Sequence, residues 1–542
     1  MSDSQAPSLS SPSLASAPAG RTVNPWLIAG AVTIAAFMEL LDTSIANVAL
    51  PYVGGGLGRS YDEVTWILTT YLVANAVVLP MTAWFSRLIG RKNYYLLCVL
   101  LFTVSSFFCG LAPSLGFMLL FRIVQGVGGG GLAPVAQAIL VDTFPPQKRA
   151  AAFALYTIVI VTAPAIGPVL GGWITDNYDW RWIFFINVPI GILSLWLSSR
   201  LIHDAEDFTR ERKQAKAEGR MSIDGIGIVL IILASAALEV SLDRGQIEDW
   251  FGSRFITIMI LIAIFGWIAT VIWERRNPDP IIDLRLFGHR NFAIASVLFF
   301  VFGIGLFGTT TLIPQMLQSL YGYRAIDAGL VLGPGALVIT IFAPISAQLL
   351  QRHLVSPKSL VIASFCIIAL SMFVFSDMTL DANSGHYAWE RALQGLGYGL
   401  FLVPVNLIAY SQLRPDQNNK ASSLTNLFRN WGGGFGIAFI TTASDRRENL
   451  HQSVLGSSLG SGAQALQQSA HPLITQLMHF GFTSADAGQA SLGVIYEQLL
   501  RQSSFLAFMD CFRVIGWLTL LTLPLIFLVR KFKATGKASA GH

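Results

Sequence analysis

The sequence has few charged residues for its length. Of its 542 residues, 12% are charged and 53% are hydrophobic, and the mean hydropathy is +0.57. This is about half the charged share usual in soluble proteins. So little polar surface excludes a set of soluble globular domains, although the length alone would allow three or four. A membrane-spanning helix needs about 20 apolar residues. The composition therefore predicts an all-α polytopic membrane protein.

The sequence also lacks the usual signs of metal, redox or nucleotide chemistry. Its four cysteines lie singly in apolar runs and its eight histidines are scattered, so we expect no metal site and no cofactor. There is no GxxxxGK[ST] loop, and the GxGxxG string at 126–131 lies inside an apolar run with no preceding strand. The GxSxG string at 456–460 lacks the strand–turn–helix context of a hydrolase. We expect no catalytic residues and therefore no enzyme.

Fourteen long apolar runs follow one another along the chain, and each is a predicted membrane span. They are 26–50, 64–84, 94–112, 115–140, 151–175, 182–201, 224–242, 254–273, 292–318, 327–350, 358–376, 388–412, 421–444 and 506–530. If the N-terminus is cytoplasmic, inner segments hold 24 of the 36 Lys and Arg residues, and the short outer loops hold five. This distribution predicts cytoplasmic termini. The basic residues behind the net charge of +5 thus lie in short loops between apolar runs and set the topology, so we expect no nucleic acid partner.

An internal repeat divides the chain into two halves. The fourth run contains RIVQGVG at 122–128, and the twelfth contains RALQGLG at 391–397, 269 residues later. Repeated halves place a substrate site near the membrane midplane and move by alternating access. The predicted organisation is six helices, two inserted helices and six helices. Its parts are a disordered cytoplasmic N-terminus (1–25), an N-terminal half (26–201), a linker with the two inserted helices (202–291), a C-terminal half (292–530) that includes an outer loop (445–505), and a cytoplasmic tail (531–542).

The first span contains two carboxylates, Glu39 and Asp42, which lie three residues apart and hence on one helix face. Arg122 enters the fourth span from the outer side and reaches a depth similar to that of Asp42. Because an ionised carboxylate is costly in hydrocarbon, such a group is paired, lines water or carries a proton. These three residues are candidates for proton coupling, and a purely structural ion pair is the alternative.

Other spans contain candidates for movement and for substrate binding. In the fifth span, Pro168 breaks the helix hydrogen-bond pattern, while Gly167, Gly171 and Gly172 allow close helix contact, which indicates either a gate or ordinary small-residue packing. Further polar residues within spans are candidates for lining a substrate cavity. These are Gln125, Gln315, Asn406, Arg429, Asn430 and Glu239. The 445–505 loop is long for a connector, so it predicts either a partner surface or a self-packed cap.

Several of these segments resemble one family, the fourteen-span EmrB-type drug:proton antiporters of the major facilitator superfamily. The similar segments are LDTSIANVALP (41–51), RIVQGVGGG (122–130), GPVLGG (167–172), WRWIFFINVPIG (180–191), LDRGQIEDWF (242–251) and IPQMLQSLYGY (313–323). The resemblance implies proton-driven export of small hydrophobic or amphipathic drugs from the inner membrane. It also implies a periplasmic adaptor (EmrA-type) and an outer-membrane channel (TolC-type) as partners. In the family, the first-span acid and the fourth-span arginine are tied to proton coupling, which falls here on Asp42 and Arg122.

Two other functions remain open at this point. The same fold and coupling would serve a dedicated exporter of one endogenous metabolite, siderophore or organic acid, and a substrate panel separates the two. A membrane-embedded sensor or enzyme would need a soluble signalling or catalytic domain, which the sequence does not show.

Overall fold

The computed structural model describes residues 24–204, 209, 224–278, 280–414, 417–461 and 463–530. Nearly all of the predicted N-terminal segment, the tail 531–542 and most of the charged part of the linker lie outside these residues. The helices are α1 (Pro25–Leu57), α2 (Tyr61–Val78), η1 (Leu79–Met81), α3 (Thr82–Ile89), α4 (Arg91–Gly110), α5 (Leu115–Thr143), α6 (Arg149–Asn177), α7 (Trp182–Phe185), α8 (Asn187–Leu201), α10 (Gly225–Arg244), η2 (Trp250–Gly252), α11 (Arg254–Arg276), η3 (Leu284–Gly288), α12 (Arg290–Tyr321), α13 (Ala325–Gln351), α14 (Pro357–Ser376), α15 (Ser384–Tyr410), α16 (Asn418–Ser461), α17 (Ala463–His479) and α18 (Ser484–Phe527).

The predicted all-α polytopic architecture is confirmed. Thirteen stretches of the described residues are helical, long and apolar enough to cross a membrane. The remaining predicted span, 421–444, lies in α16 but is not among the thirteen. Polar residues such as Asn426, Arg429 and Asn430 make this helix less apolar. Even so, α16 packs along α12 and α18 inside the bundle.

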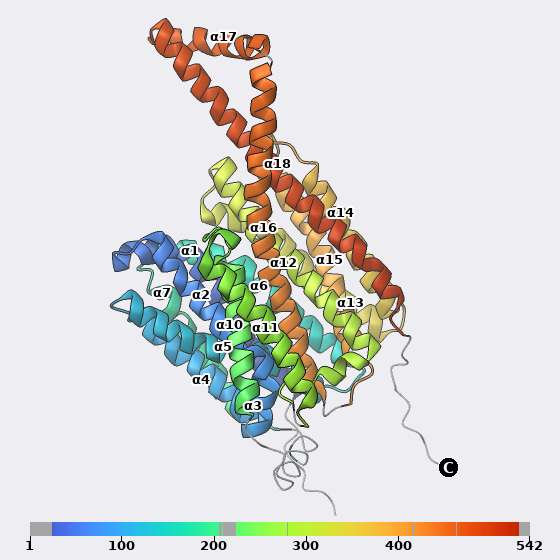
Figure 1. Cartoon of the computed structure of the whole chain (residues 1–542). Coiled ribbons are helices and arrows are strands. Elements are labelled where there is room, and N and C mark those ends of the chain that lie inside the picture. The colour runs from blue at the N-terminus through green and yellow to red at the C-terminus, as the bar shows by residue number, and fades with distance from the viewer. Residues whose placement is uncertain are drawn as a thin grey trace, which may run out of the picture.

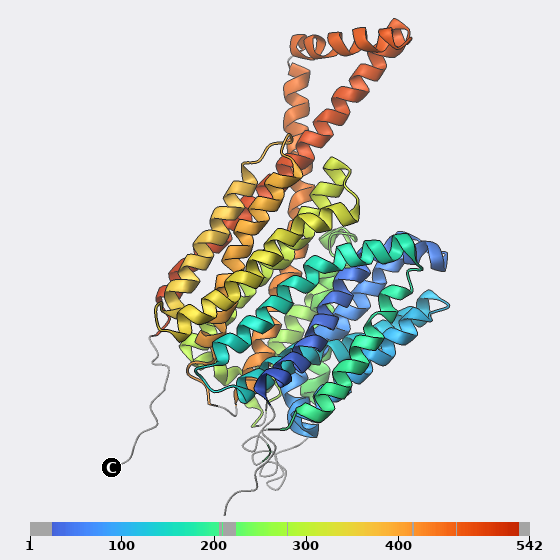
Figure 2. The ribbon, with the colours of Figure 1, turned by 180° about the vertical axis from the view of Figure 1, so that it is seen from behind.

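The long helices form two groups that meet along α6 and α13 (Figure 1 and Figure 2). In the first group, α1 packs on α6 and α8, and α5 packs on α2 and α4. In the second, α12 packs on α16, α13 on α15, and α14 on α15 and α18. The inserted helices α10 and α11 pair with each other, and α10 also contacts α2 and α16. We call the end where α1 begins and α18 ends the terminal end, and the opposite end the hairpin end.

Local sequence signals set the turns between neighbouring helices. Gly58 ends α1 in the left-handed conformation (φ 62°), which a glycine adopts without a steric penalty. Two residues later Ser60 starts α2 with a capping box, in which its hydroxyl accepts from the Glu63 backbone N–H and the Glu63 carboxylate accepts from the Ser60 backbone N–H. The chain therefore reverses direction within a few residues and places α2 beside α1.

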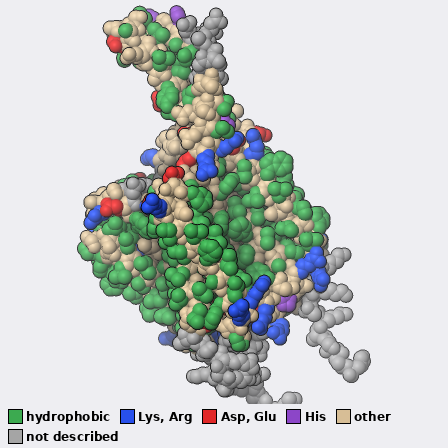
Figure 3. Space-filling model, viewed as in Figure 1, with side chains coloured by type: hydrophobic (Ala, Val, Ile, Leu, Met, Phe, Trp, Pro, Cys, Tyr) green, Lys and Arg blue, Asp and Glu red, His purple; other side chains and the backbone are tan. Residues whose placement is uncertain are grey.

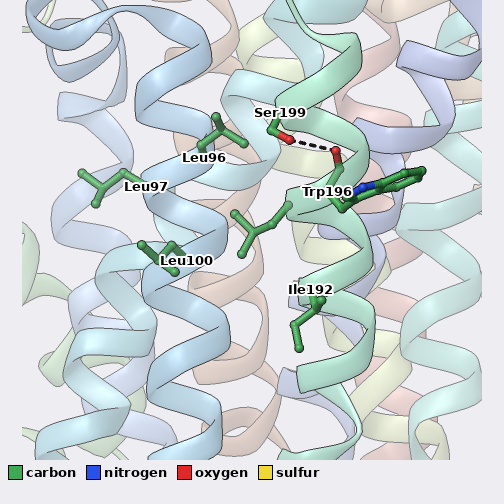
Figure 4. Close-up of a pocket in the computed structure, with 7 residues that line it drawn as sticks. Leu96, Leu97, Leu100, Ile192, Trp196 and Ser199 are labelled. Carbon is green, nitrogen blue, oxygen red and sulfur yellow. Dashed lines mark hydrogen bonds between the residues drawn. The ribbon is translucent and has the colours of Figure 1, made fainter.

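The flank of the bundle is apolar, as a membrane requires. Hydrophobic side chains cover it in the space-filling view, while charged side chains gather toward the two ends (Figure 3). A shallow groove between α4 and α8 lies on this flank (Figure 4). Its lining is apolar apart from one serine and consists of Leu96, Leu97, Leu100, Ile192, Leu195, Trp196 and Ser199. Because lipid tails cover such a surface in a bilayer, the groove marks the membrane-facing side of these two helices.

The long segment 445–505 is a helical hairpin rather than an irregular loop. The last turns of α16, the whole of α17 and the first turns of α18 form it, and it projects beyond the rest of the bundle (Figure 1 and Figure 2). Polar contacts join its two long arms: Ser504 donates to Glu448 (2.6 Å) and Gln452 donates to Tyr496 (3.0 Å). The hairpin is thus an extension of two helices of the bundle.

Candidate functional site

The carboxylate of Asp42 on α1 is the centre of a buried polar cluster. Asp42 is 2% exposed and Arg122 of α5 is fully buried. Arg122 Nη1 donates to Asp42 Oδ2 at 2.7 Å. The amide groups of Gln125 and Asn187 donate to Asp42 Oδ1 at 3.1 and 2.7 Å. The carboxylate therefore accepts three hydrogen bonds, from α5 and from the start of α8, and so ties α1 to both helices.

Further contacts hold the guanidinium of Arg122 in place. Its Nε donates to the backbone carbonyl of Ile67 on α2 (3.2 Å), and its Nη1 also donates to Gln125 (2.8 Å). The rings of Tyr71 and Phe184 lie 4.6 and 5.5 Å from the guanidinium carbon, within cation–π range. Nη2 has no hydrogen-bond partner among the described residues. Because this cation depends on one carboxylate for its neutralisation, a change in the charge of Asp42 acts directly on Arg122.

Glu39 lies one turn before Asp42 and has a different environment. Its Oε1 accepts a hydrogen bond from Asn75 of α2 at 3.2 Å. Its Oε2 is buried and has no hydrogen-bond partner in the part of the chain that the structure describes. Glu39 as a whole is only 7% exposed. Glu39 therefore has one neutral donor and forms no ion pair among the described residues.

The glycines of α6 contact two different neighbours. A methyl group on Gly167 would lie 2.4 Å from Cβ of Ser44, and one on Gly171 would lie 3.2 Å from Ile45. Both glycines therefore allow α6 to approach α1 within the first group. Pro168 lacks the N–H that would bond the Pro164 carbonyl four residues earlier. The Ser44 hydroxyl donates to that carbonyl instead, at 3.0 Å.

The other face of the same segment meets the second group of helices. A methyl group on Gly172 would lie 2.8 Å from Ile326 of α13. One on Gly329 of α13 would lie 3.1 Å from Cβ of Pro168 and 3.0 Å from Val169. Among the four candidate gating residues, Pro168 and Gly172 thus reach α13, whereas Gly167 and Gly171 contact α1.

Hydrogen bonds and a ring contact join the two groups toward the terminal end. Asn426 of α16 donates to Gln137 of α5 at 2.6 Å, and Asn418 donates to Asp142 at 3.0 Å. Asp142 also forms an ion pair with Arg91 at the start of α4. Near them the rings of Phe153 and Tyr410 stack with centroids 5.9 Å apart. These contacts link α5 and α6 to α15 and α16 at one end of the molecule.

The predicted cavity residues have different surroundings. Gln125 belongs to the Asp42 cluster, and Gln315 is exposed on α12. Asn406 is buried and donates to the Leu402 carbonyl in its own helix. Arg429 is buried and its Nε has no hydrogen-bond partner among the described residues, and Asn430 beside it is partly buried. Glu239 of α10 approaches Gly434 of α16, with Oε2 3.9 Å from a methyl group placed there.

Sequence reasoning missed two amides that complete the site. Asn187 bonds Asp42 and also donates to Ser106 of α4 at 3.1 Å, and Asn75 bonds Glu39. Each is a lone amide in an apolar run, and this isolation was the only feature of the sequence that could have indicated a role in the site. Among the described residues, no three His, Cys, Asp or Glu side chains lie together as a metal ion would need.

Comparison with known proteins gives close relatives over nearly the whole chain. The model of the Major Facilitator Superfamily matches residues 32–437. The multidrug export protein EmrB of Escherichia coli (strain K12) is 34% identical over 515 residues, which cover 94% of this chain and 97% of that protein. The fatty acid resistance protein FarB of Neisseria gonorrhoeae is 33% identical, covering 92% and 94% of the two chains. The colistin resistance protein EmrB of Acinetobacter baumannii is 29% identical with the same coverage.

Solved structures agree on the fold. The human organic anion transporter MFSD10 (TETRAN) superposes with a TM-score of 0.56 at 12% identity, covering 93% of this chain and 99% of that one. The proton:xylose symporter XylE superposes with a TM-score of 0.56 at 14% identity, covering 92% and 96%. The chain is a multi-pass membrane transporter and not an enzyme. It therefore belongs to the major facilitator superfamily, among the transporters related to the multidrug export protein EmrB.

Proposed function

We propose that this protein is a proton-coupled antiporter that exports hydrophobic or amphipathic toxic compounds by alternating access. The observation that carries the proposal is the buried Asp42 carboxylate, which accepts three hydrogen bonds and neutralises a fully buried arginine. An intramembrane carboxylate of this kind is a candidate proton carrier. The relatives named for multidrug export, fatty acid resistance and colistin resistance support the substrate class.

The geometry suggests how proton binding changes the packing of the helices. In the present arrangement every group that contacts the Asp42 carboxylate donates a hydrogen bond. A proton on Asp42 adds a donor that needs an acceptor of its own; the Gln125 or Asn187 amide can turn over to offer its oxygen, whereas Arg122 has none to offer. The proton also removes the counter-charge of Arg122. Loading a proton thus weakens the contacts of α1 with α5 and α8, and releasing it restores them.

The movement that follows takes place between the two groups of helices, which we propose correspond to the halves 26–201 and 292–530. Pro168 and Gly172 lie where α6 meets α13, while Gly167 and Gly171 attach α6 to α1. A shift of α1 on proton binding is thereby transmitted through α6 to the interface. We propose that the contacts of Gln137 with Asn426 and of Asp142 with Asn418 form the gate at the terminal end.

Proton coupling is tested with purified protein in liposomes. A drug trapped with the protein should be transported when a pH gradient is imposed, and an uncoupler should abolish that transport. Empty liposomes and liposomes with an unrelated membrane protein are the controls. Transport that needs no pH gradient, or that continues unchanged with the uncoupler, would contradict the proposal. A panel of neutral, cationic and anionic drugs in the same assay distinguishes a multidrug exporter from a dedicated exporter of one metabolite.

We propose that both termini are cytoplasmic in the inner membrane, so that the hairpin of α16, α17 and α18 projects into the periplasm. Lys and Arg concentrate in the segments at the terminal end, in agreement with the positive-inside rule. This topology is tested with single cysteines, one introduced in residues 531–542 and one at the hairpin tip. Only the hairpin cysteine should react with a membrane-impermeant thiol reagent in intact spheroplasts, and labelling of the tail alone would reverse the topology.

We further propose that this hairpin binds a periplasmic adaptor (EmrA-type), which leads to an outer-membrane channel (TolC-type). The hairpin projects away from the bundle rather than lying over it, which favours a partner surface over a cap (Figure 2). Its tip carries exposed apolar side chains: Met478 is 49%, Phe480 74% and Phe482 47% exposed. Exposed apolar residues on a projecting element are typical of a protein interface. Leu473 and Leu477 of α17 are partly exposed as well.

Shortening the hairpin distinguishes a surface that binds a partner from a part that the transporter itself needs. Removing its tip should abolish drug resistance of intact cells, where export crosses two membranes, and leave exchange of drug for protons in liposomes unchanged. Phe480→Ser with Phe482→Ser is the finer version, and Thr475→Ser on the same hairpin is a matched control. Loss of transport in liposomes as well would show that the hairpin serves the transporter itself.

A further inference from the structure

The second half repeats the arginine–glutamine pair of the Asp42 cluster without its acid. The offset of 269 residues that relates the two halves places Arg391 on Arg122 and Gln394 on Gln125. In the structure, Arg391 on α15 donates to the Gln394 side chain, just as Arg122 donates to that of Gln125. The same offset places Thr311 on Asp42. The position of the counter-ion is therefore occupied by a neutral residue.

Hydroxyl groups, not carboxylates, surround the Arg391 guanidinium. Nη1 donates to Thr309 Oγ1 and Nη2 donates to Thr310 Oγ1, both at 3.0 Å. Gln394 also donates to Thr309 and to the Tyr398 hydroxyl, each at 3.1 Å. Within the described ranges no carboxylate forms an ion pair with Arg391. The residue is nevertheless only 5% exposed.

A buried guanidinium without a counter-ion is costly. Hydroxyl acceptors satisfy its N–H groups but do not cancel its charge, and a low-dielectric interior screens that charge poorly. Charged residues inside a membrane protein usually pair with each other or lie on a substrate or ion pathway. The first half solves the same problem with Asp42. In the second half no described side chain supplies that negative charge.

The cluster can be reached along one face of α12. Thr310 and Thr311 are partly exposed, and Gln315, one turn beyond Thr311, is exposed. Thr310 accepts a hydrogen bond from Nη2 of Arg391. The Nη2 edge of the guanidinium is therefore the edge nearest to these accessible polar residues of α12. Leu312 and Ile313, which lie between these residues on α12, are fully buried in the apolar core. The polar edge is thus a small site within an apolar helix, which suits the charged head of a ligand whose tail is apolar.

We propose that Arg391, with Thr310 and Thr311, binds the anionic head group of an amphipathic substrate such as an alkyl carboxylate. This inference rests on the proposed export function and narrows its substrate class. The guanidinium donates charge-assisted hydrogen bonds to the carboxylate, and the Thr311 hydroxyl donates to its second oxygen. The Thr310 hydroxyl donates to the Leu306 carbonyl at 2.7 Å and accepts from Arg391, so it positions the guanidinium. When the anion is bound, the second half has an ion pair like the one that Asp42 and Arg122 form in the first half.

Ligands that differ only in the head group test the site by binding alone. Purified protein is titrated with radiolabelled decanoate, which is displaced by unlabelled decanoate, decanol or decyltrimethylammonium. In the wild-type protein decanoate should bind at least 10-fold more tightly than decanol. Arg391→Gln should weaken decanoate binding about 10- to 100-fold, the range of a lost charge-assisted hydrogen bond, and leave decyltrimethylammonium binding unchanged. Arg391→Lys keeps the charge but not the forked pair of donors, so its affinity for decanoate should lie between those of the wild-type protein and Arg391→Gln.

The matched control is Arg352→Gln, the same change at an exposed arginine of the same half. It should leave all three affinities unchanged. Equal loss of decanoate and decyltrimethylammonium in a folded Arg391→Gln protein, or no loss of either, overturns the inference. If that variant does not fold, equal binding of decanoate and decanol by the wild-type protein overturns it as well. Because the readout is binding, a failure of proton coupling in liposomes leaves this test unaffected, and the two proposals fail separately.

Discussion

Replacing Asp42 with asparagine should separate proton coupling from the rest of the transport cycle. The carboxylate accepts from three donors, on Arg122, Gln125 and Asn187. An asparagine offers one oxygen and one NH2 group, so in either orientation its NH2 group faces a donor. The substitution also removes the charge that neutralises Arg122. It therefore produces a site that no longer titrates and whose hydrogen bonds conflict.

The size of the structural effect follows from the burial of the pair. Removing one partner of a buried ion pair costs about 3–5 kcal/mol, because the remaining charge is left without compensation. Arg122 is fully buried and has no second acid within ion-pair distance among the described residues, so Asp42→Asn lies in this range. Adding Arg122→Gln removes the orphaned charge, and the double variant should melt at a higher temperature than Asp42→Asn alone.

Transport in liposomes gives the functional result. Asp42→Asn protein should insert into the membrane and bind drug, but a pH gradient should no longer drive drug transport. Glu39→Gln is the matched control, since Glu39 accepts one hydrogen bond from Asn75 and forms no ion pair among the described residues. It should affect coupling less and should weaken the transport of cationic drugs more than that of neutral ones. Asp42→Asn liposomes with wild-type dependence on the pH gradient would refute the assignment of the coupled proton.

Three further predictions concern packing and the gate. Gly167→Leu should keep drug binding and abolish turnover because its side chain has no room against α1, whereas Gly171→Ala, with its nearest contact at 3.2 Å, should retain most of both; normal turnover of Gly167→Leu would disprove the gating role. Asn426→Leu removes a hydrogen bond between the two groups of helices, so spin labels across the terminal end should show a wider distance distribution, and an unchanged one would exclude a gate there. Burial opposes the ionisation of Asp283, but the Lys420 ammonium at 2.8 Å outweighs it and lowers the pKa of that carboxyl. This ion pair stabilises the fold above the pKa of an unfolded aspartate, about 3.9, and its contribution to stability is lost as the pH falls further. Lys420→Met should therefore reduce the drop in melting temperature between pH 5 and pH 3.

The pairing of Asp42 with Arg122 was predictable because each charge is rare in its span and their depths match. The donors that complete the cluster were not. A lone amide such as Asn187 in an apolar run can face lipid, a neighbouring helix or the site, and helix rotation decides which. The same limit applies to α6, where small residues indicated close packing but not that Gly167 faces α1 while Gly172 faces α13.

The structure of 445–505 was only partly predictable for a different reason. The segment is polar and its helical periodicity is weak, so its own sequence favours a helix only modestly. The helices form as extensions of α16 and α18, which are already fixed in the bundle. Adding residues to an existing helix avoids the cost of nucleating a new one. A short apolar pattern therefore underestimates how far these helices continue.

The two halves keep one framework and use it differently. In each, an arginine and a glutamine one turn apart on a long helix approach the helix that begins the half. The first half adds a carboxylate, which fixes the charge inside the protein and makes it sensitive to protons. The second half adds hydroxyls, which position the arginine and leave its charge available to a ligand. A single exchange between the halves tests this division: Thr311→Asp should supply Arg391 with an internal counter-ion, reduce decanoate binding and leave pH-gradient-driven transport of neutral drugs intact. Retained decanoate affinity in that variant would show that the hydroxyl environment of the second half has no such role.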